Sequence, residues 1–405
     1  MARLSIGTGS IVLFLLSTLV SSPQSVPVFK PDPDDPRINY RGEDTTDPVS
    51  RLSRRIAHGE VQLQYSPKFG YLLSFLKELG ISVTSQSLVF SKTSLQVDRI
   101  SPAHPRALFF NDDVYVGLVR GGPLEFMAVD PQKGATFYIL DQKANAPPVP
   151  VRKFEDCWHC HMTANTLFVP GFLARSVHVT REGEPLMNEA TFLTDHTSAL
   201  AERLGGWYVT GATAVTHMGN ATSPAATATP LDFKRRVDLS HYPAQTSDAV
   251  ALMVLDHQLK LHNLITRLGY EAKLNPSELA AMIERTLRYL LFIDEAPLNS
   301  PVSASDFRTE FENRGPKDGR GRSLRDFNLK DRLFRYPCSF LIYSQAFDSL
   351  PPAAKDPLLR RLWQILSGED RSPSYSSLSP TDRRAVLEIL VATKPSLPEY
   401  FRAGI

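Results

Sequence analysis

Residues 107–140 read ALFFNDDVYVGLVRGGPLEFMAVDPQKGATFYIL, four short apolar runs separated by turn signals. The separators are Asn111-Asp112-Asp113, Gly121-Gly122-Pro123 and the stretch from Asp130 to Gly134. Short runs rich in β-branched and aromatic residues between such clusters are typical of strands joined by tight turns. Together with Leu88-Val89-Phe90, they predict an antiparallel meander or small sheet.

Helical periodicity flanks this stretch on both sides. We predict helices over 66–80, over 249–268, from 276, from 356 and from 380. Gly80 supplies a C-terminal stop for the first of them. Asn275, Pro276 and Glu278 predict a capping box at the start of the helix from 276.

The predicted fold class is mainly α with a small antiparallel β region, of the α+β type in its N-terminal part. We divide the chain into a signal peptide at 1–22, an extended linker at 23–50, a small α+β region at 51–146, an irregular segment at 147–243 and a helical region at 244–405. The boundaries follow Pro-rich or low-complexity stretches, which commonly form loops.

Composition and the N-terminus indicate an exported protein. The formal net charge is +2 and charged residues are 22% of the chain, which argues against a nucleic-acid binder that relies on bulk charge. Arg3, the apolar run 11–20 and the small residues Ser21 and Ser22 are typical of a secretory signal. The run is short for a membrane span, although an uncleaved anchor is the alternative. We expect a periplasmic or secreted protein without stable membrane insertion after cleavage.

The chemically informative motif is Cys157-Trp158-His159-Cys160-His161, which is C-x-x-C-H. Two residues between the thiols, with the histidine next to the second, allow all three groups to share one helical turn. The segment resembles the haem-attachment site of the c-type cytochromes. That resemblance implies one covalently attached haem c, held by Cys157 and Cys160, with His161 as the proximal iron ligand.

The sixth iron ligand decides which function this resemblance implies. Met218 or His217 is the candidate distal ligand, because methionine-ligated cytochromes place that residue on a loop downstream of the motif. A closed six-coordinate iron favours single-electron transfer with an unidentified redox partner protein. An open site favours a peroxidase-like enzyme or a haem-based sensor of a small ligand, so the question of enzyme activity stays open.

Several other features of the sequence allow alternative interpretations of the motif or of nearby segments. The CxxC pair also suits a thiol–disulfide oxidoreductase, which requires a βαβ unit around the motif, and, less well, a structural zinc site. The segment 205–211, with Trp207 and Tyr208, either stacks on a flat cofactor or forms a turn and a buried strand. Thr194 or Asp195 is expected to cap a helix over 199–204. The basic run 314–335 is expected to be a solvated loop, and the alternative is that it holds haem propionates or docks an acidic redox partner.

Two histidines and one cysteine are treated as structural. His257 and His262 are five residues apart on the predicted helix from 249, so they do not share a face. Cys338 lies among apolar residues and is expected to be a buried thiol.

Overall fold

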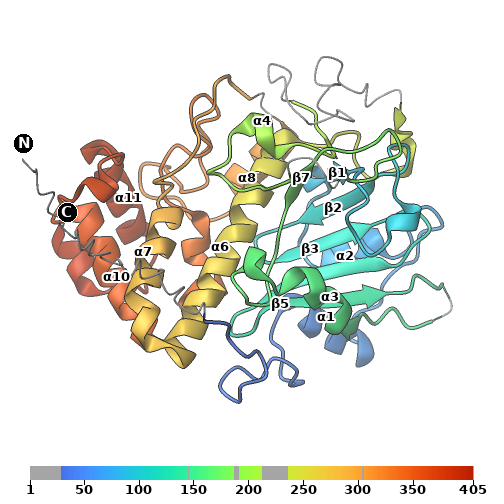
Figure 1. Ribbon diagram of the computed structural model, residues 1–405, viewed down its shortest axis with the longest axis horizontal. Coiled ribbons are helices and arrows are strands. Elements are labelled where there is room, and N and C mark those ends of the chain that lie inside the picture. The colour runs from blue at the N-terminus through green and yellow to red at the C-terminus, as the bar shows by residue number, and fades with distance from the viewer. Residues whose placement is uncertain (1–28, 145, 187–190, 212–235, 303–304, 405) are drawn as a thin grey trace, which may run out of the picture. The chain divides into compact units, whose positions relative to one another are not determined.

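One antiparallel sheet of seven strands organises the first half of the chain in the computed structural model (Figure 1). Its strand order is β6-β5-β4-β3-β2-β1-β9. The strands are β1 (Ser87–Val89), β2 (Arg106–Phe110), β3 (Val114–Leu118), β4 (Leu124–Asp130), β5 (Gly134–Leu140), β6 (Val151–Lys153) and β9 (Trp207–Tyr208). A separate two-stranded sheet pairs β7 (Arg175–Val177) with β8 (Thr191–Leu193).

The structure describes residues 29–144, 146–186, 191–211, 236–302 and 305–404. Pro31–Ile405 forms one unit. The predicted signal at 1–22 lies outside the described residues. Where the chain is described, none of its helices combines the length and the apolar character that crossing a membrane requires.

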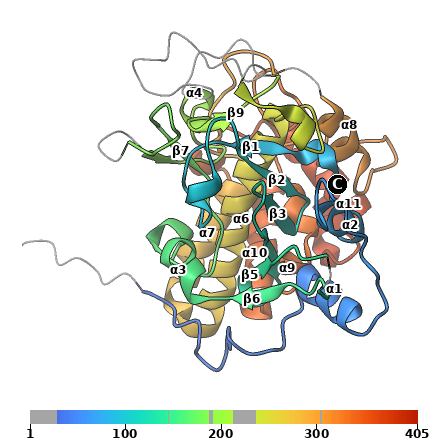
Figure 2. The ribbon, with the colours of Figure 1, turned by 90° about the vertical axis from the view of Figure 1, so that its right-hand side faces the viewer.

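The two faces of the sheet are covered by different helices. Helices α1 (Pro48–Ala57) and α2 (Leu72–Glu78) pack on one face, where the Phe75 and Phe126 rings lie 4.8 Å apart. Helix α3 (Glu155–His161) lies on the opposite side, as both ribbon views show (Figure 2). Strand alternation explains the division, because successive side chains of a strand point to opposite faces.

Helix α6 (Ala249–Leu274) links the sheet to the C-terminal helices. It is buried along most of its 26 residues and lies between the sheet and α7 (Figure 1). Gln258 marks its contact with the sheet, since its amide donates to the Tyr115 hydroxyl and to the Asn111 carbonyl oxygen. The other helices are α4 (Leu200–Arg203), α7 (Leu279–Leu290), α8 (Asp306–Asn313), α9 (Gln345–Asp348), α10 (Pro352–Ser367) and α11 (Pro380–Thr393).

The predicted fold class is confirmed, since a seven-stranded antiparallel sheet precedes a mostly helical C-terminal region. Local details differ. The Asn275 side chain makes no capping hydrogen bond at the turn that precedes α7, so the predicted capping box is wrong. Its Oδ1 accepts a hydrogen bond from the Ser277 hydroxyl instead. Helix α10 begins at Pro352, four residues before the predicted start, and contains Pro357.

Buried histidines of α6 make the fold sensitive to acid. His262 is 1% exposed, its Nε2 lies 2.8 Å from the Asp112 carbonyl oxygen, and burial lowers its pKa to about 4. The unfolded chain therefore binds a proton between pH 6.5 and 4 that the folded chain does not. Stability present above pH 6.5 is lost as the pH falls, by roughly 1 kcal/mol per pH unit for such a histidine.

We expect His262→Gln to flatten this loss, because glutamine can still donate to the Asp112 carbonyl oxygen but does not titrate. Urea unfolding at pH 6.5, 5.5 and 4.5 measures the slope. The control is His58→Gln, since the His58 side chain is 70% exposed. Equal slopes for the His262→Gln variant and the unmodified chain would contradict the assignment.

Candidate functional site

The C-x-x-C-H motif forms the short helix α3, directly after the edge strand β6. Cys157 is 9% exposed, whereas Cys160 is exposed on the outer side of the helix. Neither thiol is paired. Spacings of three and four residues place both cysteines and His161 on neighbouring turns, as the motif predicts.

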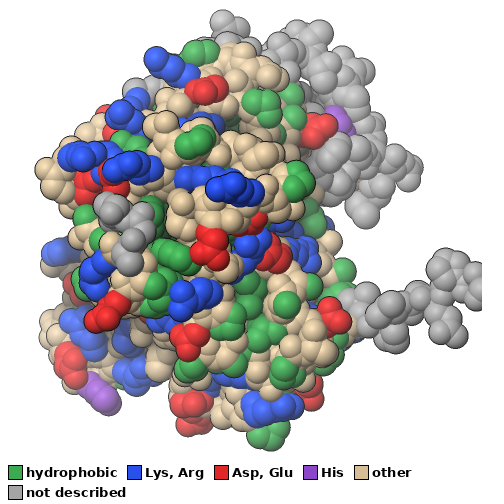
Figure 3. Space-filling view, turned by 90° about the vertical axis from the view of Figure 1, so that its left-hand side faces the viewer, with side chains coloured by type: hydrophobic (Ala, Val, Ile, Leu, Met, Phe, Trp, Pro, Cys, Tyr) green, Lys and Arg blue, Asp and Glu red, His purple; other side chains and the backbone are tan. Residues whose placement is uncertain are grey.

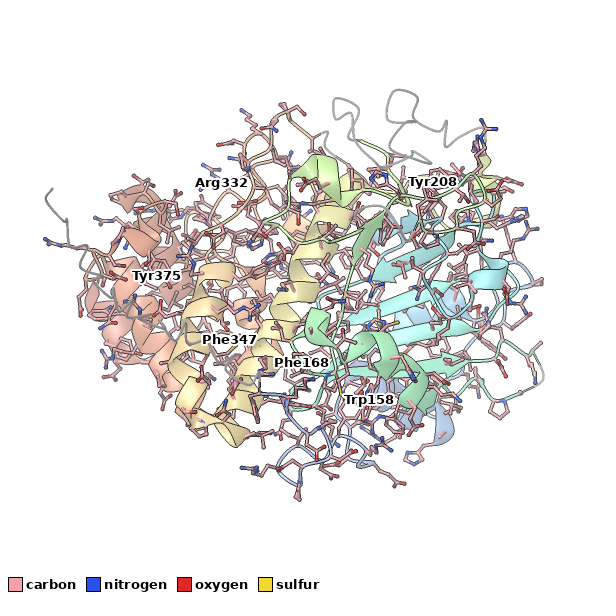
Figure 4. The ribbon with its side chains drawn as sticks, in the orientation of Figure 1. Trp158, Phe168, Tyr208, Arg332, Phe347 and Tyr375 are labelled. Atoms are coloured by element: carbon pink, nitrogen blue, oxygen red, sulfur yellow. The ribbon has the colours of Figure 1, made fainter. Side chains whose placement is uncertain are left out.

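Aromatic contacts from the N-terminal arm fasten α3 to the sheet. The Trp158 ring lies 5.1 Å from the Tyr40 ring, and the Arg41 guanidinium lies 5.0 Å from the Trp158 ring centroid. The Tyr40 hydroxyl is buried and donates to the Ala135 carbonyl oxygen at 2.6 Å. Figure 4 labels Trp158 on this helix. Residues that the sequence assigned to an extended linker thus contribute to the position of the motif.

His161 is held in one orientation by Gly171. The Gly171 N–H donates to the His161 carbonyl oxygen at 2.8 Å, and the imidazole Nδ1 lies 2.9 Å from the Gly171 carbonyl oxygen. A carbonyl only accepts, so the ring proton is on Nδ1 and the Nε2 lone pair is left bare. Burial is the main cause that lowers the pKa of His161 to about 4, which keeps the imidazole neutral at neutral pH.

The sheet beside His161 combines apolar and charged side chains. The Phe137 ring lies 5.1 Å from the imidazole, and Phe137 pairs in register with Met127 of β4. The next row across the sheet carries Leu108 and Ile139, which are partly exposed. This face therefore offers apolar contact area close to the motif.

Two arginines give this region positive charge. Arg106 reaches across Gly117 and pairs with Glu125, and a Cβ on Gly117 would lie 2.6 Å from the guanidinium. Arg175 of β7 also contributes to the low pKa of His161, and so does Arg106. Sequence reasoning missed both arginines, because each is more than a dozen residues from the motif and only the fold brings them near.

The predicted distal ligands cannot be placed. Met218 and His217 both lie outside the described residues. Among the described residues, Met127 offers a thioether sulfur on the face of the sheet that contacts His161. It is the register partner of Phe137, whose ring contacts the imidazole. A sequence search downstream of the motif does not find it, because it precedes the motif by thirty residues.

The aromatic pair at 207–208 lies on β9, at the opposite edge of the sheet from β6. The Tyr208 hydroxyl donates to the Pro102 carbonyl oxygen, and its ring packs 4.5 Å from Phe90 (Figure 4). The Trp207 indole donates to the Arg175 carbonyl oxygen. The buried-strand interpretation of this segment is therefore confirmed for Tyr208.

Other residues singled out from the sequence have structural partners. The expected cap is wrong, because Asp195 accepts from the Thr197 N–H and hydroxyl while α4 begins later, after Ala199. Cys338 is fully buried, as expected. His196 and His257 form a buried contact, with 2.7 Å between their Nδ1 atoms.

Four of the eight basic residues in the run 314–335 form ion pairs with described residues. Arg322 binds Asp318 and Glu388 of α11, and Arg332 binds Asp382 of the same helix. Figure 3, which faces the C-terminal helices, shows cationic and anionic side chains interspersed. The run is therefore fastened to α11 instead of being a purely solvated loop.

Comparisons with known proteins give no relative for this chain: no family model, no curated protein and no solved structure matches. In the part of the chain that the structure describes, no three His, Cys, Asp or Glu side chains gather in a way that would hold a metal ion, and the three cysteines are unpaired. The resemblance to the c-type cytochromes is thus wrong as a family assignment. The five-residue motif determines only the short helix α3, whereas the sheet and α6 determine the fold around it.

Proposed function

We propose that Cys157 and Cys160 hold one haem through thioether bonds, that His161 binds its iron, and that this exported protein transfers single electrons. The observation that carries the proposal is the bare Nε2 of His161, which Gly171 orients one turn from two unpaired thiols. Histidines that bind metals characteristically donate their other ring N–H to a carbonyl or carboxylate oxygen. The proposal concerns the chemistry of the motif and not membership of a family.

The surrounding residues suit a flat, apolar cofactor that carries carboxylates. Leu108, Met127 and Ile139 supply apolar area, and Arg175 supplies positive charge for carboxylate groups, whereas Arg106 is already paired with Glu125. A bound haem supplies an iron that changes oxidation state by one electron. The role of the chain is to anchor, orient and partly shield this group, while the exposed side of α3 at Cys160 leaves a surface for a redox partner protein.

A dithiol–disulfide redox centre finds less support at this motif. Reactive cysteines of that class have a lowered pKa, because the thiolate is the nucleophile. Burial and the nearby carboxylates raise the pKa of Cys157 to about 11. The described strands that follow α3 at β7 and β8 pair with each other in an antiparallel sheet, which does not give a βαβ unit around the motif.

Spectroscopy of the full chain tests the proposal. The protein is expressed with export and a haem-attachment system, and then examined by denaturing-gel haem stain and by oxidised and reduced absorption spectra. We expect a haem-stained band at the size of the protein and sharp low-spin bands on reduction. A protein that carries no covalent haem under these conditions overturns the proposal. High-spin bands would keep the attachment but move the function to a haem enzyme or sensor.

The same spectra identify the sixth ligand. Loss of a methionine charge-transfer band in Met218→Leu, with the band kept in Met127→Leu, assigns the ligand to the downstream loop. The reverse result assigns it to β4. A spectrum typical of two histidine ligands that is lost in a His217→Ala variant assigns it to His217.

A further inference from the structure

A small pocket lies where α6, α7 and the segment between β8 and α4 meet. Its volume is about 250 Å³, below the range of roughly 300–1,000 Å³ typical of sites for drug-sized ligands. Its polar lining consists of Asp195, His196, Thr197, Lys260, Arg285, Arg288, Tyr289 and Asp294. The size favours a small ligand, and three of these side chains are cations.

Two of the cations are free to bind a ligand. Arg288 donates to Asp294 and to the Ser374 carbonyl oxygen. Lys260 and Arg285, in contrast, make no hydrogen bond or ion pair with any of the described residues. Burial lowers the pKa of Lys260, the Asp195 carboxylate raises it and the Arg285 charge lowers it, whereas burial and the Arg267 charge lower the pKa of Arg285. The Lys260 side chain is partly buried and the Arg285 side chain is exposed, and an anion bound between these two like charges would relieve their repulsion.

The buried edge of the pocket is His196. Its imidazole stacks on the Tyr289 ring at 4.0 Å, and its Nε2 is buried without a hydrogen-bond partner among the described residues. The other nitrogen lies 2.7 Å from Nδ1 of His257, whose Nε2 lies 2.8 Å from the Ser339 hydroxyl oxygen. These contacts form a buried chain from Ser339 through His257 to the pocket.

The tautomers along this chain depend on which atom receives the proton of the Ser339 hydroxyl. The Ser339 oxygen already accepts from the Leu341 N–H, and His257 is the acceptor in reach of its hydroxyl proton. If Ser339 donates to Nε2 of His257, the His257 proton is on Nδ1 and is donated to Nδ1 of His196. His196, a residue of the pocket lining, then carries its own proton on Nε2, the nitrogen without a hydrogen-bond partner among the described residues.

We propose that this pocket binds a small oxyanion, a phosphate or carboxylate group, through Lys260, Arg285 and the Nε2–H of His196. The buried Ser339–His257 pair acts as a positioning element, because it fixes the tautomer in which His196 is a donor. Asp195, which is held by Thr197 at the rim, would repel an anion bound close to it, and this places the ligand towards α7. The site does not depend on the haem proposal.

Calorimetric titration of the full chain with inorganic phosphate, and separately with succinate, tests binding. We expect saturable binding of at least one of them, weakened about tenfold or more by Lys260→Gln and by Arg285→Gln. Lys77→Gln, at a lysine of α2 remote from the pocket lining, is the matched control. Tighter binding of phosphate indicates a phosphorylated ligand, and tighter binding of succinate indicates a carboxylate. Absence of saturable binding of both probes, or equal affinity in all four proteins, overturns the proposal.

Nitrogen-15 NMR of the histidine side chains tests the tautomer without any substitution at the pocket. We expect His196 to be protonated at Nε2, with that resonance shifting on addition of the bound probe. A Ser339→Ala variant should lose the single tautomer while Lys260 and Arg285 are unchanged. A His196 that is protonated at Nδ1 in the unmodified chain contradicts the proposed donor.

Discussion

A chain in which Cys157 and Cys160 are both replaced by alanine is expected to lose covalent haem completely. The two thioether bonds are the only covalent links that the proposal contains, so no haem-stained band should remain on a denaturing gel. Each single variant should keep a weaker band, because one thioether still forms. An unchanged circular dichroism spectrum would show that loss of the fold does not explain the result. We expect an unchanged spectrum for Cys160→Ala, because the Cys160 side chain is exposed.

Cys338→Ala is the matched control for the cysteine variants. This thiol is fully buried and lies outside the motif, so its removal should leave the band intact and lower stability slightly through lost packing. Full staining of the double variant would refute covalent attachment at the motif. Loss of staining in the Cys338→Ala variant alone would point to misfolding.

Replacing Asn263 by alanine is expected to have the largest effect on stability. Its amide bridges α6 to the segment after the motif, accepting from the Phe172 N–H and donating to the Phe172 carbonyl oxygen, both at 2.7 Å. Alanine leaves two buried main-chain groups without partners, at a cost of about 3 kcal/mol in the free energy of unfolding. Because Phe172 follows Gly171, the variant should also loosen His161.

Urea unfolding of Asn263→Ala and of Asn275→Ala measures this difference. Asn275 binds only the Ser277 hydroxyl at an exposed site, so its replacement should change stability by less than about 0.5 kcal/mol. Similar losses in the two variants would contradict the bridging role of Asn263. If haem is attached, a broadened or high-spin absorption spectrum in Asn263→Ala alone would indicate that the support of His161 reaches the iron.

The strands between residues 87 and 140 could be predicted closely, because turn residues separate apolar runs whose length fits strands. The edges of the sheet could not. Strand β9 consists of Trp207 and Tyr208 alone, and its pairing with β1 spans more than a hundred residues of sequence. Local pattern carries no information on such a distant partner. Helix α10 likewise starts earlier than predicted, because Pro357 was assigned to a helix start although this helix accommodates it internally.

The candidate site was predictable only where its chemistry is contiguous. The motif residues Cys157, Cys160 and His161 can be recognised within five consecutive positions. The residues that act on His161 from elsewhere in the chain are brought near it only by the fold; they are Gly171, Arg106 and Arg175. The chain of Ser339, His257 and His196 joins three segments whose separate sequences carry no shared signal. A histidine that looks structural on its helix is therefore placed in a network only by the fold.

The contacts of Tyr40 and Arg41 with Trp158 join segments of the chain that are synthesised at different times. Strand β6 contributes only three residues to the sheet, and α3 is held both by Gly171 and by an arm that emerges from the ribosome more than a hundred residues earlier. Release of that arm would detach the motif while the other strands stay paired. Under the proposed function, we therefore expect haem to be attached to the two thiols at a late step, on a chain whose other strands are already paired and before the arm closes on α3.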